Sequence, residues 1–233
     1  MGKRKKRIPM DCASCKLEVP KKVCMAKEGV GSSGCPTLTR KKILNRSNRE
    51  YERPDIKEFA RQASIQEGEC YANRHQRPYV MQPTKTRMEE IVEFSRKMKC
   101  RRLGLAFCIG LAKEAAVVEE ILRMKGFEVI TILCKAGRTS KDRIGIKDAE
   151  KIFRGTEESM CNPIFQAKLF NEEKTDLNIL LGLCVGHDSL FFKYAKAPTT
   201  VLAVKDRVTG HNPLVPIYLS TSFYQKLRHP EIS

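Results

Sequence analysis

The sequence of 233 residues contains no tryptophan, and its first 50 residues contain no phenylalanine or tyrosine either. Because proteins stack on nucleic-acid bases with aromatic rings, the N-terminal region is poorly suited to base stacking. No apolar run approaches the roughly 18 residues that a membrane-spanning helix needs. The sequence therefore predicts no membrane span and argues against recognition of bases by the N-terminal region.

The N-terminus resembles a secretory signal only in its charge. MGKRKKRIPMDC is strongly basic, but Pro9 separates Ile8 from Met10 and Asp11 follows, so the apolar segment of a signal peptide is missing. We therefore expect a cytoplasmic protein. The sequence also lacks a Walker loop, a G-x-G-x-x-G after the first predicted strand and a G-x-S-x-G elbow. A dinucleotide cofactor and a hydrolase of the serine-elbow type are therefore not supported.

Cysteine, in contrast, is abundant, with ten residues. Because the cytoplasm keeps thiols reduced, disulfides do not explain this number. Metal binding or thiol chemistry is the leading interpretation. The alternative is that the cysteines serve as small buried apolar residues.

The segment CASCKLEVPKKVCMAKEGVGSSGCP carries four of these cysteines with the spacing C-x2-C-x8-C-x10-C-P: Cys12, Cys15, Cys24 and Cys35. A C-x2-C pair is a common two-ligand clip for a tetrahedral ion. Four thiolates fit zinc or an iron–sulfur cluster, and the sequence does not decide between them. Because residues 1–50 offer little for an apolar core, we expect a metal to hold this head together. Unligated thiols are the alternative.

The net charge of the chain is +17, from 44 basic and 27 acidic residues. Much of it lies in residues 1–50, which hold fourteen Lys and Arg against four Asp and Glu. A positive surface of this kind attracts polyanions, so the head is a candidate for contact with nucleic-acid phosphates. The alternative is a solvated basic surface that favours solubility.

Beyond the head, the hydrophobic pattern predicts a helical connector over residues 51–100 and a doubly wound α/β domain over residues 101–233. Four short apolar runs alternate with helical segments: RRLGLAFCIG, FEVITILC, LNILLGLCVG and TTVLAVKD. Nearly continuous apolar strands between helices indicate a four-stranded, mostly parallel sheet with helices on both faces. By analogy with other small doubly wound sheets, we expect the strand order 2-1-3-4.

Four further cysteines fall at the carboxyl edge of this predicted sheet. Cys108, Cys134 and Cys184 end the first three strands, and Cys161 opens a helix expected over about 161–171. Ligands bind at this edge where the strand order reverses, and neighbouring strands lie about 4.8 Å apart. We therefore expect these sulfurs to form a second site that binds a metal or an iron–sulfur cluster, or supplies reactive thiols. Ordinary buried cysteines are the alternative.

Polar residues follow the same strand ends. CVGHDS supplies His187 and Asp188, and VKDRVTGHNP supplies Lys205, Arg207 and His211. His187 or Asp188 would act as acid or base, and His187 and Lys205 would orient a substrate. Lys205, Arg207 and His211 would bind an anion. If the protein is an enzyme, which the sequence leaves open, these residues predict redox or sulfur chemistry on a small anionic substrate.

A family resemblance rests on the cysteine-rich head and on four long segments: AFCIGLAKEA, MCNPIFQAKLFN, TDLNILLGLCVGHDSLF and APTTVLAVKDRVTGHNP. From about residue 10 to residue 218, the chain resembles an uncharacterised prokaryotic family of unknown function that carries a metal-binding label. The resemblance implies metal binding and nothing more about chemistry. It places the four head cysteines in the family's cysteine motif, whereas Cys70 lies outside it. Cys70 and Cys100 have no predicted role.

The sequence thus predicts a cytoplasmic metal-binding protein with a thiolate head and a second, cysteine-lined site. The competing prediction is a nucleic-acid-binding module with a structural zinc knot and an inert α/β scaffold. A third is a purely structural zinc protein whose strand-end thiols are inert.

Overall fold

The computed structural model describes residues 9–230, which fold as two compact units. The first unit ends at Ile65 and the second begins at Gln66, so the boundary falls inside one long helix, α3. The predicted division into residues 1–50, 51–100 and 101–233 is finer than this and stays a prediction.

The first unit consists of short helices and turns. Among residues 9–65 no apolar side chain is buried, so this unit lacks an apolar core. Chain segments are instead joined by hydrogen bonds and a single bridge between Lys22 and Val30. Its elements are η1 (Cys12–Ser14), η2 (Val19–Lys21), α1 (Pro36–Thr39), α2 (Lys41–Glu50) and most of α3 (Pro54–Glu69).

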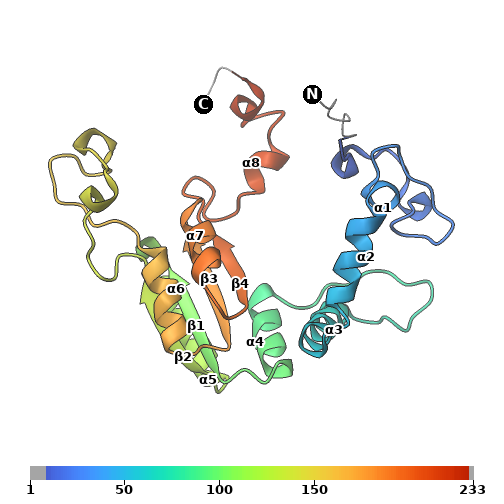
Figure 1. Ribbon diagram of the computed structural model, residues 1–233, viewed down its shortest axis with the longest axis horizontal. Coiled ribbons are helices and arrows are strands. Elements are labelled where there is room, and N and C mark those ends of the chain that lie inside the picture. Colours follow the sequence, from blue (N-terminus) through green and yellow to red (C-terminus); the bar gives the residue numbers. More distant parts are fainter. Residues whose placement is uncertain (1–8, 231–233) are drawn as a thin grey trace, which may run out of the picture. The chain divides into compact units, whose positions relative to one another are not determined.

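The second unit is an α/β domain built on a four-stranded parallel sheet with the order β2-β1-β3-β4 (Figure 1). The predicted fold class and strand order are confirmed. The strands are β1 (Arg102–Phe107), β2 (Glu128–Leu133), β3 (Leu177–Leu183) and β4 (Thr199–Val204). The helices are α4 (Arg87–Lys97), α5 (Ala112–Met124), α6 (Pro163–Glu172), α7 (His187–Tyr194) and α8 (Val215–Tyr218). Short 3-10 turns are η3 (Ile109–Leu111), η4 (Lys141–Ile144), η5 (Asp148–Glu150) and η6 (Gln225–Arg228).

The sheet has an apolar layer on each face because alternate side chains of a strand point to opposite sides. On one face, Leu103 and Leu105 of β1 join the cluster formed with α4 and α5. On the other face, Ala106 joins the cluster formed with α6 and α7. There the rings of Phe170 and Phe191 meet edge to face, with centroids 6.0 Å apart. Helices therefore cover both faces, as the continuous apolar strands indicated.

Helix α6 begins two residues later than the sequence suggested. Asn162 is its N-cap: its side-chain oxygen accepts a hydrogen bond from Phe165 N at 3.0 Å, and Pro163 occupies the first helical position. Both residue types favour a helix start. Cys161 therefore lies in the loop just before the helix. Among residues 9–230, no helix combines the length and the apolar character that spanning a bilayer demands.

Gly182 interrupts the regular alternation of β3 at the carboxyl edge. Its φ is +68°, and the pairing with β4 shifts register around it. As a result, Leu181 packs with the α4–α5 cluster, but Leu183, two residues on, packs on the opposite face. Irregularities of this kind re-aim side chains near sites. Gly182 thus sets the direction in which the end of β3 leaves the sheet.

We expect Gly182→Ala to lower the free energy of unfolding by about 1–3 kcal/mol, because alanine is strained at this φ and overpacks its surroundings. An added methyl would lie 2.1 Å from Leu111 Cδ1. Urea unfolding measures the change. Gly110→Ala is the matched control, since its methyl would meet no atom of another residue closer than 3.5 Å. Equal stability of the two variants would contradict this account of β3.

Candidate functional site

The backbone ladder of the sheet continues past the strand ends and holds two cysteines at the carboxyl edge. Cys134 N donates to Phe107 O at 2.8 Å, and Cys108 N donates to Leu181 O at 3.1 Å. These bonds fix Cys134 beside the end of β1, and Cys108 beside the end of β3. Strand pairing alone therefore brings Cys108 and Cys134 to neighbouring positions.

A third cysteine joins them from the long loop between β2 and α6. Asn162 N donates to Cys134 O at 2.7 Å, which joins the backbone next to Cys161 to the end of β2. The sulfurs of Cys134 and Cys161 lie 3.6 Å apart. Cys134 is 2% exposed and Cys108 is 9% exposed, whereas Cys161 is partly exposed. All three pack with the apolar cluster beneath α6 and α7.

Hydrogen bonds between the thiols set their acidity in a graded series. The hydrogen bond that Cys161 shares with Cys134, aided by the charge of Lys135, lowers the pKa of Cys161 to about 7 despite burial. A bond from Cys108 to Cys134, together with burial, raises the pKa of Cys108 to about 12. The bond with Cys108 acts to lower the pKa of Cys134. The bond with Cys161 and burial act in the opposite direction and dominate, so the pKa of Cys134 is raised. Ile109 N also donates to the Cys134 sulfur, at 3.4 Å. The series places negative charge on Cys161 first.

Cys184, at the end of β3, contacts a cation rather than another thiol. Arg207 Nη2 donates to its sulfur at 3.1 Å. The charges of Cys184 and Cys108 both act to raise the pKa of Cys161, so all four edge cysteines lie within electrostatic range of one another. Among residues 9–230, no group of three or more His, Cys, Asp or Glu side chains is already arranged to hold a metal ion. The structure therefore brings three of the predicted cysteines together, whereas Cys184 lies nearby and contacts Arg207 instead of another thiol.

Two lysines supply positive charge beside these thiols. Lys205 N donates to Leu183 O at 3.1 Å, and a methyl group at Gly110 would lie 3.5 Å from Lys205 Nζ. The charge of Lys205 acts to lower the pKa of Cys108, although the interaction with Cys134 and burial outweigh it. Lys135, which the sequence analysis did not single out, follows Cys134 directly. Its Nζ donates to Ser159 O and acts electrostatically on Cys161. Its position next to a strand-end cysteine was the signal available in the sequence.

The other predicted polar residues stabilise local turns. Asp188 Oδ1 accepts from Gly186 N at 3.0 Å and from Ser189 N at 2.7 Å, at the start of α7. His211, with a φ of +70°, accepts at Nδ1 from Asp206 N at 3.1 Å. Their predicted roles as acid, base or anion ligand stay predictions.

His187 is a predicted catalytic residue that, like Lys205, interacts electrostatically with the thiols. It is the first residue of α7, and burial, together with the charge of Lys135, lowers its pKa. The charge of Cys108 acts on it in the opposite direction. A neutral imidazole at neutral pH can accept a proton, which is compatible with the predicted role of His187.

Gln166 of α6 is a further buried polar residue at this edge. Its Nε2 donates to Ile132 O at 2.9 Å and to Phe107 O at 3.4 Å, at the ends of β2 and β1. Its Oε1 is buried and has no hydrogen-bond partner among the described residues. Sequence pattern alone did not indicate this residue, because a glutamine on an apolar helix face carries no recognisable motif.

In the head, contacts draw the two ends of the cysteine segment together. Ser32 Oγ donates to Asp11 Oδ1 at 2.7 Å. A methyl group on Gly34 would lie 2.9 Å from Asp11 Cγ, so the two segments are closely packed. Asp11 precedes Cys12, and Gly34 precedes Cys35. These contacts therefore place the first and last cysteine segments side by side.

A second set of head contacts links Cys24 to the same region. Val23 N donates to Val30 O at 2.9 Å, which closes the loop that contains Cys24. Next to this pair, Gly31 packs against Cys35, whose sulfur would lie 3.0 Å from a methyl at Gly31. Cys12 and Cys24 are exposed, while Cys15 and Cys35 are partly exposed. Loop contacts rather than a core thus organise the cysteines.

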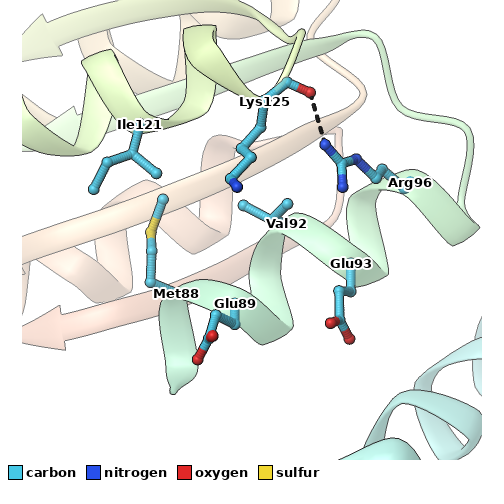
Figure 2. A pocket seen from close by; sticks show the side chains of 7 residues that line it. All are labelled: Met88, Glu89, Val92, Glu93, Arg96, Ile121 and Lys125. Atoms are coloured by element: carbon cyan, nitrogen blue, oxygen red, sulfur yellow. Dashed lines mark hydrogen bonds between the residues drawn. The ribbon is translucent and has the colours of Figure 1, made fainter. Parts of the chain in front are cut away.

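A hollow of about 200 Å³ lies between α4 and α5, away from the cysteines (Figure 2). Arg96 Nη2 closes one end by donating to Lys125 O at 3.0 Å. The residues that line the hollow belong to the helices on the face of the sheet opposite α6 and α7, and none of them is a cysteine. They are Met88, Glu89, Val92, Glu93, Arg96, Ile121 and Lys125. This hollow therefore does not contribute to the cysteine site.

Residues 35–202 match the family model described as Protein of unknown function (DUF1847). The chain belongs to this family. The predicted resemblance to an uncharacterised family is confirmed, but the DUF1847 match begins at Cys35 and ends before Lys205, so it does not include the other head cysteines. The four edge cysteines all lie inside it.

The chain is also similar to the uncharacterised protein MJ0455 of Methanocaldococcus jannaschii. The two are 52% identical over 142 residues, which cover 61% of this chain and 70% of that relative. Neither the DUF1847 family nor this relative has an assigned activity, so a function has to be argued from the site.

We expect iodoacetamide to alkylate Cys161 before Cys108 and Cys134 at neutral pH, because the thiolate is the nucleophile. Peptide mass spectrometry of chelator-treated protein at a series of pH values should give a midpoint near 7 for Cys161. Cys134→Ala removes the hydrogen bond that stabilises the thiolate, so the midpoint should rise. Cys100→Ala should leave it unchanged. A midpoint that does not respond to Cys134→Ala would contradict the thiol series.

Proposed function

We propose that this protein binds a metal ion or an iron–sulfur cluster through cysteine thiolates at the carboxyl edge of its sheet. The observation that carries the proposal is the 3.6 Å separation of the Cys134 and Cys161 sulfurs. Tetrahedral zinc–thiolate bonds of about 2.3 Å place pairs of sulfurs about 3.8 Å apart. The existing pair is therefore close to the spacing that two ligands of one such ion require.

Cys108 and Cys184 are the candidates to complete the ligand set. Cys108 lies beside Cys134 at the edge and packs in the same apolar cluster, and Cys184 acts electrostatically on Cys161. Rotation of their side chains would be needed, since no three-ligand group is ready-made among residues 9–230. Soft thiolate ligands favour zinc or iron–sulfur clusters over magnesium or calcium.

Positive charge around the thiols supports the same proposal. Several thiolates on one metal centre carry an excess of negative charge, which nearby cations offset. Arg207 contacts Cys184, Lys205 acts on Cys108, and Lys135 acts on Cys161. The same cations, with His187, would orient a small anionic substrate if the centre is catalytic. Because metal-binding thiolates must stay reduced, we place the protein in the cytoplasm.

A second thiolate site in the head is part of this proposal. Residues 9–65 bury no apolar side chain, and small domains without a core are usually held by a metal or by disulfides. Contacts around Asp11 and Val30 draw the cysteine-bearing loops together. Zinc is the simpler ligand for such a structural site, and an iron–sulfur cluster is the alternative.

The test is the metal content of protein purified without oxygen. We expect bound zinc, or iron with acid-labile sulfide and visible absorbance. Cys134→Ala with Cys161→Ala should remove the edge centre only, and Cys12→Ala with Cys15→Ala should remove the head centre only. Cys100→Ala is the control for an unrelated thiol. Protein that holds no metal even after reconstitution, or full occupancy in both double variants, would refute the proposal.

Nucleic-acid binding is a second candidate, favoured by helix α2. All ten residues of Lys41–Glu50 are exposed, and they include four Lys and Arg against one Glu. Phosphate contacts by such a helix would be independent of sequence and weakened by salt.

We expect any binding of an oligonucleotide to fall steeply as salt increases, and to weaken when Lys42 and Arg46 are changed to Gln. Fluorescence anisotropy with a labelled single strand measures both effects. Changing Lys193 and Lys196, in the α7 region, to Gln provides a control of equal charge. Affinity that is unaffected by the α2 substitutions would exclude this helix as the contact.

A further inference from the structure

The pair formed by Cys134 and Cys161 has the geometry for a second chemistry that needs no metal. A disulfide has an S–S length of about 2.05 Å, so the sulfurs, 3.6 Å apart, must approach by roughly 1.5 Å. The backbones are already joined by the bond from Asn162 N to Cys134 O. Formation of a disulfide therefore requires movement of the two side chains toward each other.

We propose that Cys161 and Cys134 form a redox-active dithiol that reduces small disulfides carrying carboxylate groups. Cys161 is the attacking residue because it is partly exposed, whereas Cys134 is 2% exposed and can react only with a neighbour. In such a pair, the substrate reaches the exposed attacking cysteine. The buried resolving cysteine then attacks the sulfur of its partner. This activity is separate from the proposed metal binding, although it uses two of the same residues.

The reaction proceeds by two exchanges. Cys161 loses its proton to water and its sulfur attacks one sulfur of the substrate; the substrate S–S bond breaks, and the first substrate thiolate leaves and takes a proton from water. Cys134 then attacks the Cys161 sulfur, the bond between Cys161 and the substrate sulfur breaks, and the proton of Cys134 passes to the second substrate thiolate as it leaves. The two cysteines are oxidised to one disulfide, and the substrate disulfide is reduced to two thiols. Cys108 packs in the same apolar cluster as Cys134, next to the resolving residue.

The charge around the pair selects the substrate class. Neither Lys205 nor Arg207 forms an ion pair with a carboxylate among the described residues, so their charges are available to a ligand. Lys135 is less available, because Glu158 lies 3.9 Å from it and also pairs with Lys141 at 2.8 Å. The edge therefore favours an anionic disulfide over a cationic one.

The test uses reduced full-length protein stripped of metal with a chelator, so its outcome does not depend on metal binding. Dithiodipropionate, a dianionic disulfide, is compared with cystamine, a dicationic one. We expect a Cys134–Cys161 disulfide in non-reducing peptide maps, and two more thiols released per chain than from a variant with both Cys134→Ser and Cys161→Ser. Dithiodipropionate should react faster by roughly tenfold or more at low salt.

Variants separate the two steps. Cys134→Ser should stop at a mixed disulfide on Cys161 with one thiol released at this site, and Cys161→Ser should release none there. Lys205→Gln with Arg207→Gln should reduce the preference for dithiodipropionate over cystamine, and Cys100→Ser should react as the wild type does. Wild-type protein that forms no Cys134–Cys161 disulfide, or that accumulates the mixed disulfide unresolved, would overturn the proposal. Failure to bind metal would leave this result unaffected.

Discussion

The candidate site depends on a backbone hydrogen bond from Asn162 N to Cys134 O at 2.7 Å, supported by the bonds from Met160 N to Thr139 O and from Lys135 Nζ to Ser159 O. It joins the end of the 135–160 loop to the end of β2 and so brings Cys161 to a sulfur on the sheet edge. With it, three thiols form one hydrogen-bonded series whose most acidic member is also the most accessible.

This arrangement explains why the edge cysteines differ although they occupy similar positions in the sequence. Cys108 and Cys134 are buried by the sheet and by α6, and burial disfavours their thiolates. Cys161 shares a hydrogen bond with Cys134 and is acted on by the charge of Lys135, and both favour its thiolate. Cys184 contacts Arg207 instead of another sulfur. The same cations that would neutralise a metal–thiolate centre would also attract an anionic substrate, so metal binding and thiol exchange have the same electrostatic requirement.

The sequence was sufficient to predict the sheet, its strand order and the position of the strand-end cysteines. Continuous apolar runs fix where each parallel strand ends, and so Cys108, Cys134 and Cys184 could be assigned to one edge. The approach of Cys161 to Cys134 was expected in outline. The contact that brings them together, made by Asn162, depends on how a loop of more than twenty residues folds back onto the sheet. Local pattern carries no information about such a contact.

Other features were beyond sequence reasoning for related reasons. Because Gly182 has a positive φ, the side chain of Leu183 packs on the face of the sheet opposite to the one that strict alternation along β3 would predict. The bond between Arg207 and Cys184 joins residues 23 positions apart. In the head, the DUF1847 match covers Cys35 alone among the four cysteines. The metal site proposed there rests on spacing and loop contacts.

The most direct measurement is X-ray absorption at the metal bound by a variant that lacks Cys12 and Cys15, in which the edge is the remaining proposed site. The account predicts a coordination shell dominated by sulfur at about 2.3 Å, which disappears when Cys134 and Cys161 are also replaced. A shell of nitrogen and oxygen alone, or a sulfur shell that survives the loss of both residues, would contradict it.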